Sequence, residues 1–285
     1  MSQNKDSKIT VEKIETLIRT NKMSEAHESL VRLAATKPAR ESLLGLARMA
    51  RMAGNYSLAL RTLHSNRDSE AEKAEYAAAL VGMGAFEEAK TILKSITNDP
   101  QKNLIQGWLA LDTWNVKEAI TALNQFHKNP KADELQKQWG QLLFAKAHLL
   151  AKDYSQADSL LNNLMQSAKG PENAWIAENA IELSTQSAVT QENWTEANNL
   201  IGRLSDYGKA LWKSVMEVRK SKGSPESLTA LKEAKKNSHL KKHWEAARYC
   251  DLVEGLTLRD EKLLSHLYFG TPYTGFRSYL ESEFG

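Results

Sequence analysis

The chain has 285 residues, which is enough for one large domain or for two domains of ordinary size. Its 38 Lys and Arg residues against 35 Asp and Glu residues give a formal net charge of +3, so the whole molecule has no electrostatic field strong enough to indicate nucleic acid or anionic lipid as its partner. The single cysteine, Cys250, excludes an internal disulfide and indicates a reducing compartment. With only 6 prolines and 14 glycines, the composition predicts an all-α fold.

The first eight residues are polar and lead into an amphipathic segment, without the apolar stretch of a secretory signal. Further along, no uncharged apolar run approaches the roughly 18 to 20 residues that a membrane-spanning helix needs. We therefore expect a cytoplasmic protein that has no membrane partner.

A short phrase recurs six times: a turn residue, a spacer, a large apolar residue, two more spacers and an alanine. The copies occupy residues 21–26, 54–59, 84–89, 114–119, 152–157 and 192–197. Each copy lies between two apolar helical segments and so predicts a helical hairpin. The turn residue ends the first helix, the large side chain lies between the two helices, and the alanine lets their backbones approach closely. Trp114 and Trp194 fall at these turns, and we expect both in the core.

This phrase resembles the tetratricopeptide repeat, which has a period of about 34 residues and carries Gly, an aromatic residue and Ala at these offsets. The best copy has Gly84, Phe86 and Ala89, with a repeat-ending Pro100. The resemblance implies an all-α, right-handed superhelical solenoid of about seven helical hairpins with a C-terminal capping segment.

Three regions follow along the chain. Residues 8–210 are the tetratricopeptide-like repeats, although Trp114 and Lys152 stand where the family has glycine. Residues 211–267 are expected to form a degenerate helical repeat that is basic, and residues 268–285 form an aromatic segment that is either a cap or a junction.

Residues with catalytic or metal-binding chemistry do not form a known pattern. His239 and His243 stand four residues apart but lack an acidic third ligand, so they predict a solvated basic helix rather than a metal site. The glycine-rich phosphate-binding motifs and the nucleophile elbow of hydrolases do not occur. We expect no metal, no cofactor and no enzymatic activity.

In the tetratricopeptide family, the first helix of each hairpin lines a concave surface that binds a protein or peptide. Aligning the repeats on their alanines places these residues on that surface: Arg19, Glu41, Arg48, Arg51, Trp108, Asp112, Trp139, Lys146 and Gln186. Arg and Trp are frequent at interaction hot spots, and such a groove would suit an acidic or C-terminal carboxylate peptide. The alternative is that the tryptophans separate helices and the arginines keep a helix face soluble, and the sequence leaves both open.

A local basic stretch is the second candidate surface. Between Tyr207 and Cys250 the sequence has eleven Lys and Arg residues and four Glu residues, which gives this stretch a net charge of +7. The candidate nucleic-acid contacts are Lys232, Lys235, Lys236, Lys241 and Lys242. The alternative is a solvated exterior face.

The C-terminal residues from 268 onward hold six of the fourteen Phe and Tyr side chains of the chain. Gly270 and Pro272 are expected to break a helix, and a short helix restarts near Phe276. One interpretation is a cap that folds back over the last apolar face of the solenoid. The other is a junction, because the run resembles bacterial regulatory proteins in which helical repeats precede a winged-helix DNA-binding domain.

The sequence therefore supports two hypotheses for the function. The first is a non-catalytic scaffold that binds a protein or peptide partner in its concave groove. The alternative is the sensor module of a bacterial transcriptional regulator, which contacts DNA or a DNA-bound partner through its basic C-terminal region.

Overall fold

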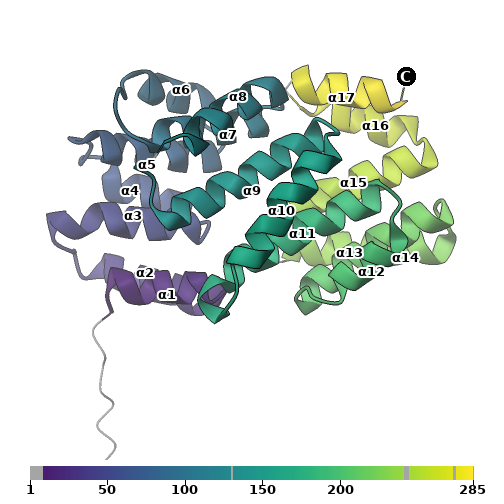
Figure 1. The fold of residues 1–285 in the computed structure, drawn as a ribbon, viewed down its shortest axis with the longest axis horizontal. Coiled ribbons are helices and arrows are strands. Elements are labelled where there is room, and N and C mark those ends of the chain that lie inside the picture. The colour runs from purple at the N-terminus through teal and green to yellow at the C-terminus, as the bar shows by residue number, and fades with distance from the viewer. Residues whose placement is uncertain (1–8, 130, 241–243, 272–273, 285) are drawn as a thin grey trace, which may run out of the picture. The chain divides into compact units, whose positions relative to one another are not determined.

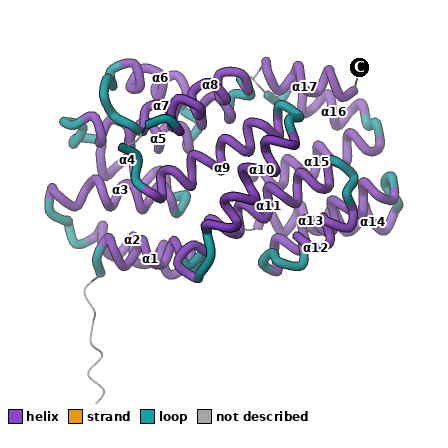
Figure 2. The backbone as a smooth tube through the Cα atoms, viewed as in Figure 1, coloured by secondary structure: helices purple, strands orange, loops and turns teal. Residues whose placement is uncertain are grey.

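A computed structural model describes residues 9–129, 131–240, 244–271 and 274–284. Within these residues the chain forms 17 α-helices, two short 3-10 helices and no strand (Figure 2). The predicted all-α fold class is therefore confirmed.

The α-helices follow one another through short connections (Figure 1). In chain order they are α1 Val11–Arg19, α2 Met23–Ala35, α3 Leu43–Met52, α4 Tyr56–Leu63, α5 Glu70–Gly82, α6 Phe86–Lys94, α7 Gln101–Asp112, α8 Val116–His127, α9 Glu134–Leu150, α10 Tyr154–Ser167, α11 Ala174–Thr190, α12 Trp194–Ile201, α13 Asp206–Ser221, α14 Pro225–Leu240, α15 Trp244–Leu258, α16 Glu261–Phe269 and α17 Thr274–Phe284. The 3-10 helices η1 Arg40–Ser42 and η2 Pro171–Asn173 precede α3 and α11. Residue 210, where the predicted repeats end, lies inside α13.

The turn residues of the six repeated phrases share a left-handed backbone conformation. Their φ angles are 58° at Asn21, 74° at Gly54, 78° at Gly84, 59° at Trp114, 60° at Lys152 and 58° at Glu192. This conformation ends a helix, and the following N–H caps it: the Asn55 amide donates to the Ala50 carbonyl at 2.7 Å. The second helix of each hairpin then begins at the large apolar residue of the phrase, as at Tyr56 and Phe86.

The alanines of the six phrases are all fully buried. Each has an exposed fraction of 0%: Ala26, Ala59, Ala89, Ala119, Ala157 and Ala197. Small residues allow equally close packing elsewhere, since a Cβ atom on Gly107 would lie 2.5 Å from Leu123 Cγ, and one on Gly140 would lie 2.4 Å from Phe126 Cε1. The helix pairs α1–α2, α3–α4 and α5–α6 pack against each other, with the buried alanines Ala26, Ala59 and Ala89 in their second helices.

The chain divides into two compact units that are not continuous in sequence. The first unit contains residues up to 112, 117–144 and 166–177, and the second contains 113–116, 145–165 and residues from 178 onward. In the first unit, the first helix of each hairpin packs against the first helix of the next, from α1 through α3 and α5 to α7. These four helices therefore form one layer.

In the second unit, α13, α14, α15 and α16 pack consecutively. The aromatic C-terminal segment joins this packing, because Phe276 and Leu280 are buried in one cluster with Leu267 and other residues of α15 and α16. The Trp114 ring lies 4.7 Å from the Phe276 ring, measured between centroids. Arg277 Nη2 donates to the Thr271 carbonyl at 2.7 Å, which holds α17 against the end of α16. The segment is thus packed within the second unit.

Candidate interaction surface

Two arginines of α3 share one buried carboxylate of α5. Glu75 is fully buried, and the side chain of Arg51, 7% exposed, donates from Nε and from Nη2 to its two oxygens. Arg48 Nε lies 3.7 Å from Glu75 Oε2, which is beyond hydrogen-bond distance. Since an unpaired buried carboxylate costs several kcal/mol in desolvation, Arg51 is needed to hold Glu75 in the core.

Two half-buried tryptophans lie beside this ion pair. The Arg51 guanidinium carbon is 4.7 Å from the centroid of the Trp139 ring on α9. That ring meets the Trp108 ring of α7 edge to face, with centroids 5.2 Å apart and planes at 76°. A cation–π contact contributes about 0.5–2 kcal/mol, and an edge-to-face pair contributes about 0.5–1.5 kcal/mol. Arg51, Trp108 and Trp139 thus form one aromatic–cationic cluster in the first unit.

Arg48 is the accessible cation at the edge of this cluster. Its side chain is 28% exposed, and its Nη1 lies 3.7 Å from Asp133 Oδ2. Its Nε atom is buried and has no hydrogen-bond partner in the described part of the chain. Burial raises the pKa of the neighbouring Asp99 carboxyl, and the charge of Arg48 opposes that rise. Arg48 therefore makes only loose ion pairs, with Glu75 and with Asp133, and part of its side chain is open to solvent.

The other predicted groove residues lie elsewhere. Arg19 donates from Nε to the Glu172 carbonyl at 3.1 Å and from Nη2 to Asn173 Oδ1 at 3.2 Å, so the chain's own η2 segment occupies it. Glu41 is exposed in η1, and Asp112 is the partly exposed last residue of α7.

Lys146 on α9 and Gln186 on α11 belong to the second unit, where both are partly exposed. Of the nine predicted residues, the structure links four: Arg48 and Arg51 share the Glu75 carboxylate, Arg51 contacts Trp139, and Trp139 contacts Trp108. These four residues are called the arginine–tryptophan face below.

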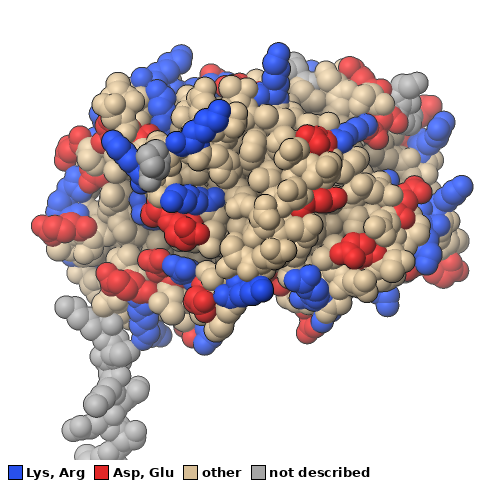
Figure 3. Space-filling model, in the orientation of Figure 1, with Lys and Arg blue, Asp and Glu red and all other residues tan. Residues whose placement is uncertain are grey.

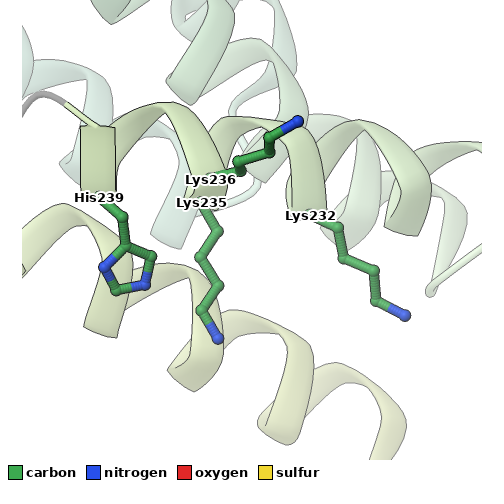
Figure 4. Close-up of a pocket in the computed structure, with 4 residues that line it drawn as sticks. All are labelled: Lys232, Lys235, Lys236 and His239. Atoms are coloured by element: carbon green, nitrogen blue, oxygen red, sulfur yellow. The ribbon is translucent and has the colours of Figure 1, made fainter.

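The basic stretch is partly neutralised by its own neighbours. Lys232 Nζ lies 3.6 Å from Glu254 Oε1, Lys236 Nζ lies 4.0 Å from Glu233 Oε2, and Lys235 is paired with Asp251. Figure 4 shows the Lys235 side chain directed toward a neighbouring helix, whereas Lys236 extends to the other side of α14.

The remaining candidate nucleic-acid contacts, Lys241 and Lys242, lie outside the described residues, as does His243. On the face drawn in Figure 3, Lys and Arg side chains are interspersed with Asp and Glu rather than gathered into one patch of a single sign. Mixed charges of this kind provide little of the counterion release that drives binding to phosphate backbones.

The groups with nucleophilic or metal-binding potential are few. Burial raises the pKa of the Cys250 thiol to about 12, so it stays protonated and is a poor nucleophile at neutral pH. Among residues that the structure describes, no group of three or more His, Cys, Asp or Glu residues is placed to hold a metal ion. Within the same residues, no helix has both the length and the apolarity to cross a membrane.

Sequence reasoning missed the two carboxylates that pair with Arg48 and Arg51, namely Glu75 and Asp133. Glu75 interrupts the apolar run from Ala74 to Val81, and a single charge inside such a run is a signal for a buried ion pair. Asp133 gave no comparable signal, because its contact with Arg48 joins residues 85 positions apart.

In comparisons with known proteins, no family model matches the chain, and the searches of curated proteins and of solved structures find no match.

Proposed function

We propose that the chain is a non-catalytic scaffold that binds a protein or peptide partner through the arginine–tryptophan face of its first unit. The observation that supports this function is the partly exposed side chain of Arg48, which makes only loose ion pairs and shares the Glu75 carboxylate with Arg51, the cation that contacts the indole pair. Arg and Trp are the side chains most enriched at energetic hot spots, because they combine a large contact area with directional bonding.

The proposed architecture is a right-handed superhelical solenoid of about seven tetratricopeptide-like hairpins. The layer of first helices from α1 to α7, the six left-handed turns and the six buried alanines support it. In such a solenoid, residues on consecutive first helices form one continuous surface, and α17 covers the last apolar face as a cap.

The alternative, a sensor module of a transcriptional regulator, requires the basic stretch to contact DNA or a DNA-bound partner. The acidic partners of Lys232, Lys235 and Lys236 weigh against direct DNA contact, since each pair must be broken or shared on binding. DNA contact would also show a steep loss of affinity with salt.

The experiment that tests the scaffold function is partner capture from a cell lysate by the intact chain and by Arg48→Ala. Arg51 is unsuitable, because its removal would leave Glu75 buried without a hydrogen-bonded partner. The matched control is Arg32→Ala, which removes an exposed arginine of α2 in the same unit. A hot-spot residue contributes at least about 2 kcal/mol, so we expect Arg48→Ala to lower the affinity for the captured protein roughly 30-fold.

Nuclease treatment and a salt series accompany this capture. Equal capture by Arg48→Ala and the intact chain would contradict the proposed surface. Capture that disappears with nuclease or moderate salt would move the function to nucleic acid and to the basic stretch.

A further inference from the structure

An open groove lies between α2 and α4 of the first unit, where the start of α3 also contributes to its wall. The groove has a volume of about 420 Å³. That volume is within the range of about 300–1,000 Å³ that is typical of ligand-binding clefts. Apolar side chains form most of the lining: Val31, Ala34, Pro38, Leu43, Leu46 and Leu58. The groove can therefore receive an apolar side chain of a partner.

The polar residues of the groove differ in how far they are already engaged. Asn55 Oδ1 accepts from the Leu58 amide at 3.2 Å, and the Thr62 hydroxyl donates to the Leu58 carbonyl at 2.8 Å. Arg61, by contrast, is exposed and makes no hydrogen bond or ion pair with the described residues. Five other arginines of this unit contact a carboxylate or an aromatic ring: Arg19, Arg40, Arg48, Arg51 and Arg67. Arg61 thus leaves a free guanidinium beside apolar walls, which suits a partner that brings a carboxylate close to an apolar side chain.

Val31 gives the groove an exposed apolar edge that the repeat itself does not require. This residue is 60% exposed, and it stands five positions after Ala26, the alanine of the first repeated phrase. The same position of the other five phrases holds polar residues or glycine: His64, Lys94, Asn124, Asn162 and Gly202. A polar residue at this position is therefore compatible with the hairpin, and the exposed valine extends the apolar surface of the groove instead.

A second exposed apolar surface lies at the end of α16. Phe269 is 77% exposed, more than any other large apolar residue that the structure describes. Its ring meets the Tyr268 ring edge to face, with centroids 5.2 Å apart, and the Tyr268 hydroxyl donates to Glu281 Oε1 of α17 at 2.7 Å. The nearby Arg277 guanidinium is already engaged by the Tyr268 and Thr271 carbonyls. Tyr268, Phe269 and Glu281 thus place an exposed ring and a carboxylate in one cluster, called the aromatic tip below.

The two surfaces also belong to segments of opposite charge. Residues 9–64, which include the helices of the groove, contain nine Lys and Arg residues and five Glu residues, a net charge of +4. Residues 260–284, which include the aromatic tip, contain four Asp and Glu residues and two Lys and Arg residues, a net charge of −2. We infer from this complementarity that the aromatic tip of one molecule binds in the groove of a second copy of the chain. Phe269 lies against the apolar lining near Val31, and the carboxylate of Glu281 faces Arg61.

A contact of this kind joins two different surfaces, so it links copies head to tail and does not close into a symmetric pair. One apolar anchor and one ion pair make a small interface, so the association is weak and depends on the protein concentration. The contact involves none of the four residues of the arginine–tryptophan face. Its test therefore does not depend on the proposed function.

The test is sedimentation velocity of the full-length chain and two variants at rising protein concentration. Arg61→Glu reverses the charge of the groove, and Phe269→Ala removes the ring of the tip; both side chains are exposed, so the fold is kept. We expect the average mass of the intact chain to rise with concentration and each variant to weaken this association at least about 10-fold. The matched controls are Lys94→Glu, which reverses an exposed cation of α6, and Met83→Ala, which removes another exposed apolar side chain. Both controls should associate like the intact chain.

A mixture of the two variants separates a head-to-tail contact from any other association. Arg61→Glu retains the aromatic tip and Phe269→Ala retains the groove, so the mixture should form one-to-one dimers that do not grow further. A chain that stays monomeric at every concentration, association that survives both substitutions, or a mixture that fails to form dimers would each overturn the inference. An equal loss of association in Lys94→Glu or Met83→Ala would also overturn it, because the association would then not depend on the groove and the tip.

Discussion

Four of the six turn residues that end a first helix carry side chains in the left-handed region, where a residue other than glycine costs about 1–2 kcal/mol. Asn21 tolerates this region better than the others, and Trp114 uses its turn to contact Phe276. The Glu192 side chain is exposed, so its left-handed conformation is not offset by a packing contact like that of Trp114. The strain at Glu192 is therefore uncompensated.

We expect Glu192→Gly to raise the free energy of unfolding by about 0.5–1 kcal/mol, since glycine relieves the strain at the expense of greater freedom in the unfolded chain. Urea unfolding monitored by circular dichroism measures this change. Asn199→Gly, in the interior of α12, is the matched control and should lower the stability by a few tenths of a kcal/mol. A loss of stability in Glu192→Gly would contradict the assignment of the turn.

A second residue-scale feature is the carboxyl of Glu182 on α11. Burial raises its pKa from 4.5 to about 7, and the charge of Glu178 adds to the rise. The folded state therefore prefers the protonated carboxyl, whereas the unfolded chain ionises near pH 4.5. Above pH 4.5 the unfolded state binds fewer protons, so the stability falls as the pH rises through 7 and then levels off.

Between pH 5 and 8, the loss attributable to Glu182 is about 1–3 kcal/mol, which is the free energy of the pKa difference reduced for the partial exposure of the side chain. We expect Glu182→Gln to remove this dependence when unfolding free energies are measured at successive pH values. Glu233→Gln, at an exposed carboxylate of α14, should leave the slope unchanged. An identical slope in Glu182→Gln and the intact chain would show that another group titrates.

At the scale of elements, the packing of α17 can be tested with two phenylalanines that differ strongly in burial. Phe276 is 6% exposed, and Phe269 at the end of α16 is 77% exposed. We expect Phe276→Ala to lower the free energy of unfolding by about 3 kcal/mol through the cavity that it leaves, and Phe269→Ala to lower it by less than about 0.5 kcal/mol. Thermal unfolding of both variants measures the difference, and equal stabilities would contradict the burial of Phe276 against α15 and α16.

The helical hairpins were predictable from sequence because their determinants are local. Gly84 and Ala89 stand five residues apart and fix a turn and a close helix contact without reference to the rest of the chain. The surface was predictable only in part. Arg48 and Arg51 lie on the first helix as expected, but whether an arginine is free depends on partners such as Glu75, 24 residues beyond Arg51.

For the whole molecule, the two units could not be read from the sequence, because neither is a continuous stretch. Both α9 and α11 contribute residues to each unit, so the boundaries fall inside helices where composition shows no change. The division predicted at residue 210 was based instead on the weakening of the repeated phrase along the sequence. A repeat pattern reports contacts between neighbours, whereas the contact of Arg48 with Asp133 joins segments several hairpins apart.

The contact between Trp114 and Phe276 also has a consequence for biosynthesis. Phe276 follows Trp114 by 162 residues, so the ribosome needs about 8–32 s after Trp114 to make the residue against which its ring packs. During that interval the Trp114 indole lacks the ring that packs against it in the folded second unit. The packing of the second unit is therefore completed only late in translation, after α17 has been synthesised.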